Sequence, residues 1–89
     1  MRVAVGARIT GLPEQMAALD ELLQDLKHRE AGWAVEIGRS ATVREIQVRM
    51  IARGLDEALL TVRTGLEDVV KELDPPPELA WARPRQVEM

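Results

Sequence analysis

The chain has no cysteine, no phenylalanine and no tyrosine, and only two tryptophans, one histidine and one serine. The absence of cysteine excludes disulfides, thiolate zinc sites and thiol nucleophiles, which favours a reduced, cytoplasmic protein. The scarcity of aromatic residues argues against sheet-surface RNA binding, because such readers stack bases on exposed rings. Neither stabilisation by disulfides or thiolate zinc sites nor RNA binding by base stacking is therefore expected of this chain.

Motifs that carry chemistry are also absent. The sequence has no GxGxxG or GxxxxGK[ST] phosphate loop and no HExxH metal motif. His28 is expected in the last turn of a helix, where it favours the helix dipole, and Ser40 in a turn without a GxSxG context. Carboxylate pairs fall on outward helix positions, where water solvates them and acid-base catalysis is disfavoured. The sequence therefore predicts no catalytic residue, no cofactor and no metal, and an enzyme is disfavoured.

Long apolar runs are missing as well. No segment approaches the roughly 18 apolar residues of a membrane span or the roughly 7–15 of a signal peptide core. We therefore expect neither membrane association nor a targeting segment. The 89 residues suffice for one domain. A domain of this size buries only roughly 60% of its unfolded surface, so self-association would be a natural source of added stability.

Three stretches alternate apolar and polar residues with the period of a half-buried strand: 2–10, 33–38 and 43–53. Residues 38–42 between the last two are small and polar, which favours a hairpin. The stretch 78–89 is ambiguous: Leu79 and Trp81 alternate with alanines, so a short edge strand, a docked segment and a mobile tail all remain open.

Two stretches follow helical spacing, one from Pro13 to Arg29 and one from an N-cap at Asp56 to Leu73. Leu55 and Leu60 could form a hydrophobic staple around that cap, and Gly65 in mid-helix could permit close approach by a neighbour. The apolar stripes consist of Met16, Leu19, Leu22, Leu23 and Leu26 in the first helix and Leu59, Val62, Leu66, Val69 and Leu73 in the second.

The element order β-α-β-β-α predicts an α+β two-layer sandwich with the split-βαβ topology of ferredoxin-like domains. We expect one domain over residues 1–74, followed at 75–89 by a proline-rich tail or short edge strand. Both helices should cover one face of the sheet and leave the other open. The first strand would lie at an edge unless the tail covers it.

Charge is predicted to separate between the two layers. The strand stretches carry Arg2, Arg8, Arg39, Arg44, Arg49 and Arg53 against Glu36 and Glu45, whereas the helices are acidic. A basic sheet surface and an acidic helix surface would follow. The candidate interaction residues are Arg2, Ala4, Arg8, Glu36, Gln47, Arg49, Ile51, Arg53 and Trp81.

These features favour a non-enzymatic interaction or assembly module, self-associating or binding a protein partner through the sheet face or the first-strand edge. One alternative is a ligand-binding or enzymatic dimer with a pocket between paired sheets, lined by Trp33, Met50 and Trp81. Another is a weak nucleic-acid binder using the arginines, although phosphate contacts without stacking are salt-sensitive. The partner itself is not identified by the sequence.

Overall fold

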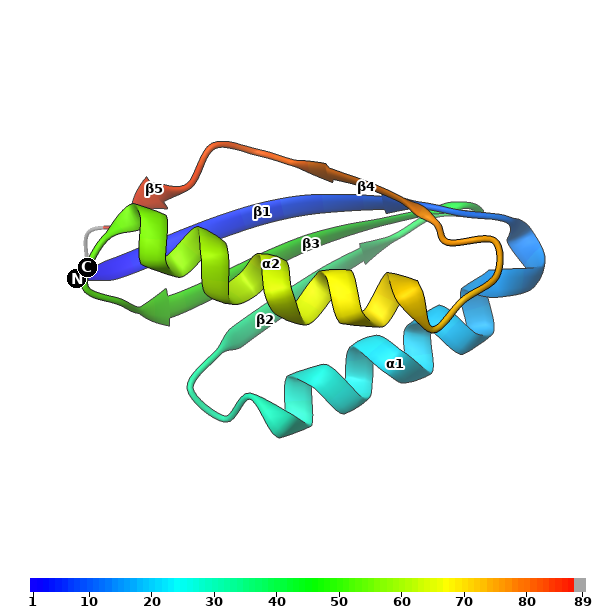
Figure 1. Ribbon diagram of the computed structural model, residues 1–89, viewed down its shortest axis with the longest axis horizontal. Coiled ribbons are helices and arrows are strands. Elements are labelled where there is room, and N and C mark those ends of the chain that lie inside the picture. Colours follow the sequence, from blue (N-terminus) through cyan, green and yellow to red (C-terminus); the bar gives the residue numbers. More distant parts are fainter. Residues whose placement is uncertain (88–89) are drawn as a thin grey trace.

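The computed structural model describes residues 1–87 and contains one five-stranded antiparallel sheet and two α-helices (Figure 1). A single 3₁₀ turn, Pro13–Gln15, precedes the first helix. The elements are β1 Arg2–Thr10, α1 Met16–Arg29, β2 Ala34–Arg39, β3 Val43–Ile51, α2 Leu55–Lys71, β4 Glu78–Trp81 and β5 Arg85–Gln86.

The strand order is β2-β3-β1-β4, and β5 pairs with β1. β3 thus lies between β1 and β2, as a split β-α-β arrangement requires, and the predicted two-layer α+β architecture is confirmed. β1 is an interior strand because β4 and β5 both pair with its outer side. The edge that β1 would have exposed is therefore covered by this chain's own C-terminal segment.

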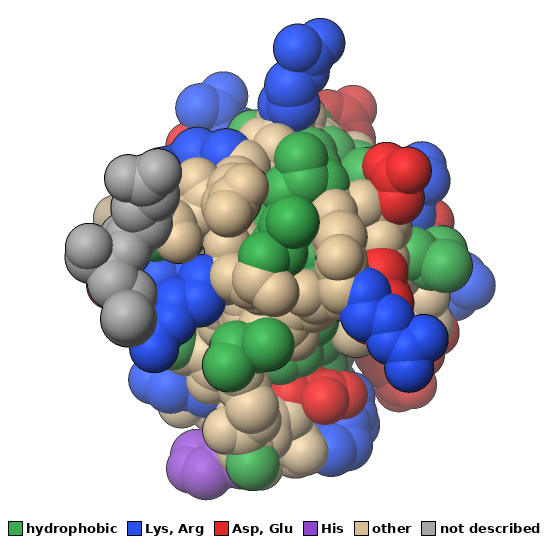
Figure 2. Space-filling view, turned by 90° about the vertical axis from the view of Figure 1, so that its left-hand side faces the viewer, with side chains coloured by type: hydrophobic (Ala, Val, Ile, Leu, Met, Phe, Trp, Pro, Cys, Tyr) green, Lys and Arg blue, Asp and Glu red, His purple; other side chains and the backbone are tan. Residues whose placement is uncertain are grey.

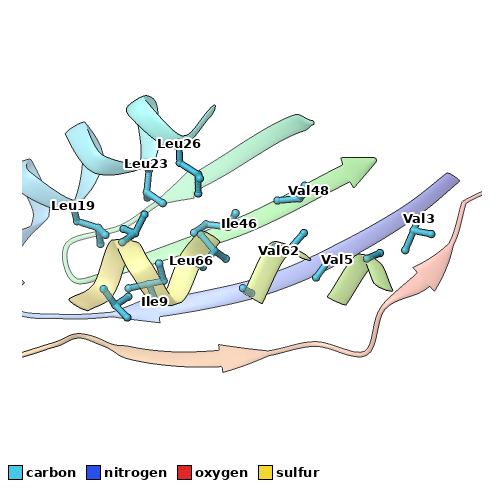
Figure 3. Close-up of a cluster of buried hydrophobic side chains, with 14 of the residues drawn as sticks. Val3, Val5, Ile9, Leu19, Leu23, Leu26, Ile46, Val48, Val62 and Leu66 are labelled. Atoms are coloured by element: carbon cyan, nitrogen blue, oxygen red, sulfur yellow. The ribbon is translucent and has the colours of Figure 1, made fainter. Parts of the chain in front are cut away.

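The core lies between the helices and one face of the sheet (Figure 3). Most of its residues are apolar positions predicted from the alternation of the strands and the spacing of the helices. Ala52, Ala58 and Val70 also belong to it without having been predicted, and the predicted Leu22, Leu59 and Leu73 are only partly buried against it. Burying each such aliphatic side chain contributes about 1.5–3 kcal/mol. The largest fully buried side chains are Ile9, Leu19, Leu66, Val3, Val5, Val48 and Val62.

The start of α2 differs from the prediction. Its N-cap is Gly54, which is extended (φ −164°, ψ 174°), and Asp56 lies inside the first turn. The carboxylate there favours the helix dipole without capping the helix. Leu60 is 64% exposed, so the predicted staple is also wrong. α2 ends at Lys71, two residues before the predicted Leu73.

Gly65 allows a close approach, as expected from its position in mid-helix. A Cβ atom there would lie 3.2 Å from Trp33 Cη2 and 3.3 Å from Leu26 Cδ1. Trp33 precedes β2 and is half-buried, and Leu26 belongs to α1. The missing side chain therefore lets α1 and the start of β2 pack directly against the backbone of α2.

The predicted separation of charge between the two layers is wrong for Arg39 and Arg44. Arg44 of β3 is paired with Arg39 of β2, and both lie on the face of the sheet that is turned toward the helices. Only 5% of Arg44 is exposed. Its guanidinium donates to Asp20 of α1, with Nε–Oδ1 at 2.7 Å and Nη2–Oδ2 at 3.1 Å. Arg39 Nε lies 3.7 Å from the same carboxylate. These cations therefore join the layers instead of adding to the exposed sheet surface.

Candidate interaction surface

The side of the sheet away from α1 and α2, here called the open face, has no helix of residues 1–87 packed on it (Figure 1). The strand register decides which residues it carries, because residues paired across strands share a face. From the C-terminal segment it carries Glu78, Ala80, Ala82 and Arg85. From the first three strands it carries Arg2, Ala4, Gly6, Arg8, Thr10, Ala34, Glu36, Gly38, Val43, Glu45, Gln47, Arg49 and Ile51.

The middle of the open face is flat. Gly6, Gly38, Ala80 and Ala82 lie near its centre, and a shallow hollow of about 500 Å³ lies over them. A Cβ at Gly6 would be 3.4 Å from the Cβ of Ala82, which is ordinary van der Waals contact. The hollow therefore exists because these four residues have little or no side chain.

The charges of the open face are distributed along the strands. Arg2, Arg49 and Arg85 lie toward the end where β1 begins, which we call the basic end. Glu45 and Glu78 lie toward the opposite end, the acidic end. Arg8 nevertheless lies beside Glu45, and Glu36 lies on the central row, so both signs are present along the face with more arginines at the basic end.

Two ion pairs cross neighbouring strands on this face. Arg8 Nε is 2.6 Å from Glu45 Oε1, and Arg49 Nη1 is 3.7 Å from Glu36 Oε1. All four side chains are more than half exposed. Exposed pairs of this kind contribute about 0–1 kcal/mol, so they do little for stability and remain available to a partner.

Most of the predicted interaction residues come together on the open face: Arg2, Ala4, Arg8, Glu36, Gln47, Arg49 and Ile51. Their exposure differs sharply. Ile51 is 75% exposed, whereas Ala4 is 2% exposed and offers neighbours little more than a flat surface. Ile51 can therefore contact a partner, whereas Ala4 is too buried to do so.

Arg53 and Trp81 do not belong to this group. β3 ends at Ile51, and Arg53 lies in the bend before α2. Trp81 pairs with Ala7, so it faces the helices, where it is half-buried against the core. Leu79 and Trp81 are two residues apart in β4, and residues i and i+2 of a strand point to the same face, so Trp81 faces inward with Leu79.

The C-terminal segment adds four residues to the open face that were not among the predicted interaction residues: Glu78, Ala80, Ala82 and Arg85. The alternation of 78–82 contained the signal for the first three, since it marks the alanines as the opposite face from Leu79. Nothing in the local sequence indicates that Arg85 pairs beside Ala4, because that contact depends on where the chain returns after Pro84.

Apolar side chains also gather at the end of the molecule where β1 begins, β3 ends and α2 begins (Figure 2). Met1 is 48% exposed and Leu55 is 36% exposed at this end, next to Ile51. An adjoining hollow of about 430 Å³ is lined in part by Met50 and Val87. The open face is therefore bordered by apolar surface at its basic end.

Other features offer little chemistry. Within residues 1–87, no group of three histidine, aspartate or glutamate side chains is placed to hold a metal ion. No helix in that range is long and apolar enough to cross a membrane. His28 is exposed, with Nδ1 2.8 Å from the carbonyl oxygen of Gln24, and Ser40 lies in the exposed turn between β2 and β3.

A groove between α1 and α2 has a volume of about 800 Å³. Its lining combines Asp25, Glu30, Asp68 and Glu72 with Arg29 and Lys71. These are solvated helix residues of both signs, which is typical of an ordinary helix surface.

A scan against protein-family models finds no match, and searches of curated proteins and of solved structures find none.

Proposed function

We propose that this protein is a non-enzymatic interaction or assembly module that binds a protein partner, or its own kind, through the open face. The observation that carries the proposal is a four-strand face without a helix over it, on which Ile51 is 75% exposed. A flat centre of glycine and alanine lets a second surface approach the strands closely. The reducing cytoplasm is the proposed setting, because this fold uses no disulfide.

The size of the face supports this role. The strands β1, β3, β2, β4 and β5 have nine, nine, six, four and two residues, and at about 3.3 Å per residue and about 4.8 Å between strands they give a footprint of roughly 500 Å². Specific interfaces bury about 800 Å² per partner, with weak ones below that. The face alone therefore fits a weak or transient interface, and the apolar border around Met1 and Leu55 would enlarge it.

The face is favoured over an edge strand as the contact. The edge of β1, a contact suggested by the sequence, is covered by β4 and β5. The remaining outer strands are β2, of six residues, and β4, of four. Short edge strands are a common protection against pairing with other chains, so these offer less than the face.

Nucleic-acid binding is disfavoured by the composition of the face. Glu36, Glu45 and Glu78 lie among its arginines and would repel phosphates. Neither tryptophan is on this face, since Trp81 is turned toward the helices and Trp33 packs against α2. No aromatic ring is therefore placed there to stack a base.

One observation favours a second candidate, a ligand site formed when two faces pair. The central hollow has polar groups around it, among them Arg8, Glu36, Glu45 and Gln47. A partner sheet above it would enclose a cavity lined by charged and amide groups. Binding of small acids or bases that appears only in an associated state would support this candidate, whereas a dry, fully packed interface would contradict it.

The proposed function is tested with two matched substitutions. Ile51→Glu places a charge on the open face, and Leu60→Glu places the same charge at another exposed apolar residue, on α2. We expect light scattering to give a mass above 9.9 kDa, or affinity capture to retain a specific protein, and Ile51→Glu alone to abolish it.

A strict monomer that captures nothing would contradict the proposal. Association that responds equally to both substitutions would also contradict it, because the open face would then have no special part. Far-ultraviolet circular dichroism of each variant checks that it remains folded.

A further inference from the structure

We propose that the partner is a second copy of this chain, docked face to face on the open face with a two-fold axis running across the strands. This inference rests on the proposed function and specifies it. Under such an axis, each strand lies over the same strand of the second copy in the opposite direction. The axis passes through the row formed by Glu36, Gln47 and Gly6.

The residues of β3 are self-complementary about this row. Gln47 faces Gln47 of the second copy, and an amide can both donate and accept there. Two residues away on either side are Arg49 and Glu45, so each arginine faces the other copy's glutamate. Four residues away are Ile51 and Val43, which pair apolar with apolar. Two-fold symmetry makes each of these contacts twice.

The neighbouring strand supports the same axis. Gly6 of β1 faces Gly6 of the second copy, so the two sheets can approach closely at the centre. Packed sheets lie about 10 Å apart, a gap that an extended arginine and a glutamate can span together. Arg49 and Glu45 are both more than half exposed, so each can turn from its exposed ion pair within the chain, with Glu36 and Arg8 respectively, toward the second copy.

A two-fold axis along the strands is less favourable. It would place β3 over β1 of the second copy, so that Ile51 faced Arg2 and Arg49 faced Ala4. The exposed isoleucine would then lose its apolar partner and the arginine would face no carboxylate. Charge and apolar matching therefore both select the axis across the strands.

Two contacts oppose the arrangement. Arg8 of β1 faces Ala4 of the second copy, which offers it no carboxylate, although Glu45 of its own chain remains beside it. Glu36 lies on the central row and faces Glu36 of the second copy, and like charges placed opposite each other repel. Arg49 of the same chain is 3.7 Å from Glu36 and offsets part of this repulsion. The footprint of roughly 500 Å² per copy also lies below that of most stable dimers. We therefore expect a dimer that forms at about micromolar to submillimolar concentration.

A charge exchange tests the orientation by sedimentation velocity, at concentrations from about 5 to 500 µM. Arg49→Glu and Glu45→Arg should each weaken association by at least about 10-fold, because each puts like charges in contact. The double variant R49E/E45R restores opposite charges across the axis, although each new side chain lies beside a like charge of its own chain, Glu36 or Arg8, so it should associate more tightly than either single variant. Arg63→Glu, an exposed arginine on α2, is the matched control and should change nothing.

A wild-type chain that stays monomeric throughout this range would overturn the inference. So would association that the double variant fails to restore while its thermal unfolding is unchanged. If the wild type is monomeric yet captures another protein in an Ile51-dependent manner, this inference fails and the interaction module stands. If it neither associates nor captures a partner, both fail.

Discussion

Arg44 on β3 forms a two-pronged ion pair with Asp20 on α1, and only 7% of the arginine side chain is exposed. Its Nη1 also donates to the carbonyl oxygens of Ser40, at 2.6 Å, and Val43, at 3.0 Å. One buried cation therefore connects the helix layer, the sheet and the β2–β3 turn. A buried charge is tolerated only where its donors are paired, and this one is.

The first prediction concerns the two ends of this pair. Asp20→Ala leaves the buried guanidinium without its counter-ion and should cost about 3 kcal/mol of unfolding free energy. Arg44→Met replaces the cation with an apolar chain of similar length and should cost less, although two carbonyl oxygens lose a donor. Urea unfolding of both variants gives the comparison. A larger loss for Arg44→Met would contradict this account.

The second prediction concerns pH. The hydrogen bond from Arg44 lowers the pKa of Asp20 below its ordinary 3.8; burial opposes this shift, and the charges of Arg44 and Arg39 add to it. A carboxyl group whose pKa is lower in the folded state stabilises the fold above the unfolded value, and this stability is lost as pH falls through the folded pKa.

Wild-type protein should therefore lose more unfolding free energy than Asp20→Asn between about pH 5 and pH 2. Chemical unfolding across this range measures both curves. Parallel curves for the two proteins would show that the pair contributes nothing to the acid sensitivity.

The third prediction concerns the contact at Gly65. Gly65→Val should destabilise the fold by about 2 kcal/mol or more, because its Cβ would press on Trp33 and on Leu26, which is 4% exposed. Thr64→Val, at the neighbouring exposed position, is the control and should change stability by less than about 0.5 kcal/mol. Thermal unfolding distinguishes them, and a harmless Gly65→Val would refute the close packing.

The positions that faced the core could be predicted from the sequence because strand alternation and helical spacing are local. Arg44 shows where local patterns fail to predict burial. The strand alternation places it inward, but a buried charge is tolerated there only because Asp20 of α1 pairs with it. Gly54 is the N-cap of α2 in place of Asp56, without a side-chain cap hydrogen bond. Trp81 was a candidate interaction residue, with docking onto the chain itself left open, and its pairing with Ala7 of β1 turns it toward the helices. Arg44 and Trp81 therefore depend on tertiary contacts that no local pattern contains.

The fourth prediction concerns the repulsion on the proposed two-fold axis. Glu36→Gln removes the like charges that face each other and should strengthen self-association by about 3-fold or more at low salt. The gain should shrink in high salt, since ions screen exposed charges. Sedimentation equilibrium at two salt concentrations measures it. Unchanged association of Glu36→Gln would place this residue outside the interface, and weaker association would contradict the repulsion.

The most direct test of the account is sedimentation velocity of the wild type, Ile51→Glu and Leu60→Glu side by side at about 200 µM. We predict that the wild type and Leu60→Glu sediment above the monomer mass of 9.9 kDa, and that Ile51→Glu sediments as a monomer. Ile51→Glu sedimenting together with the other two would contradict the central claim that the open face makes the contact.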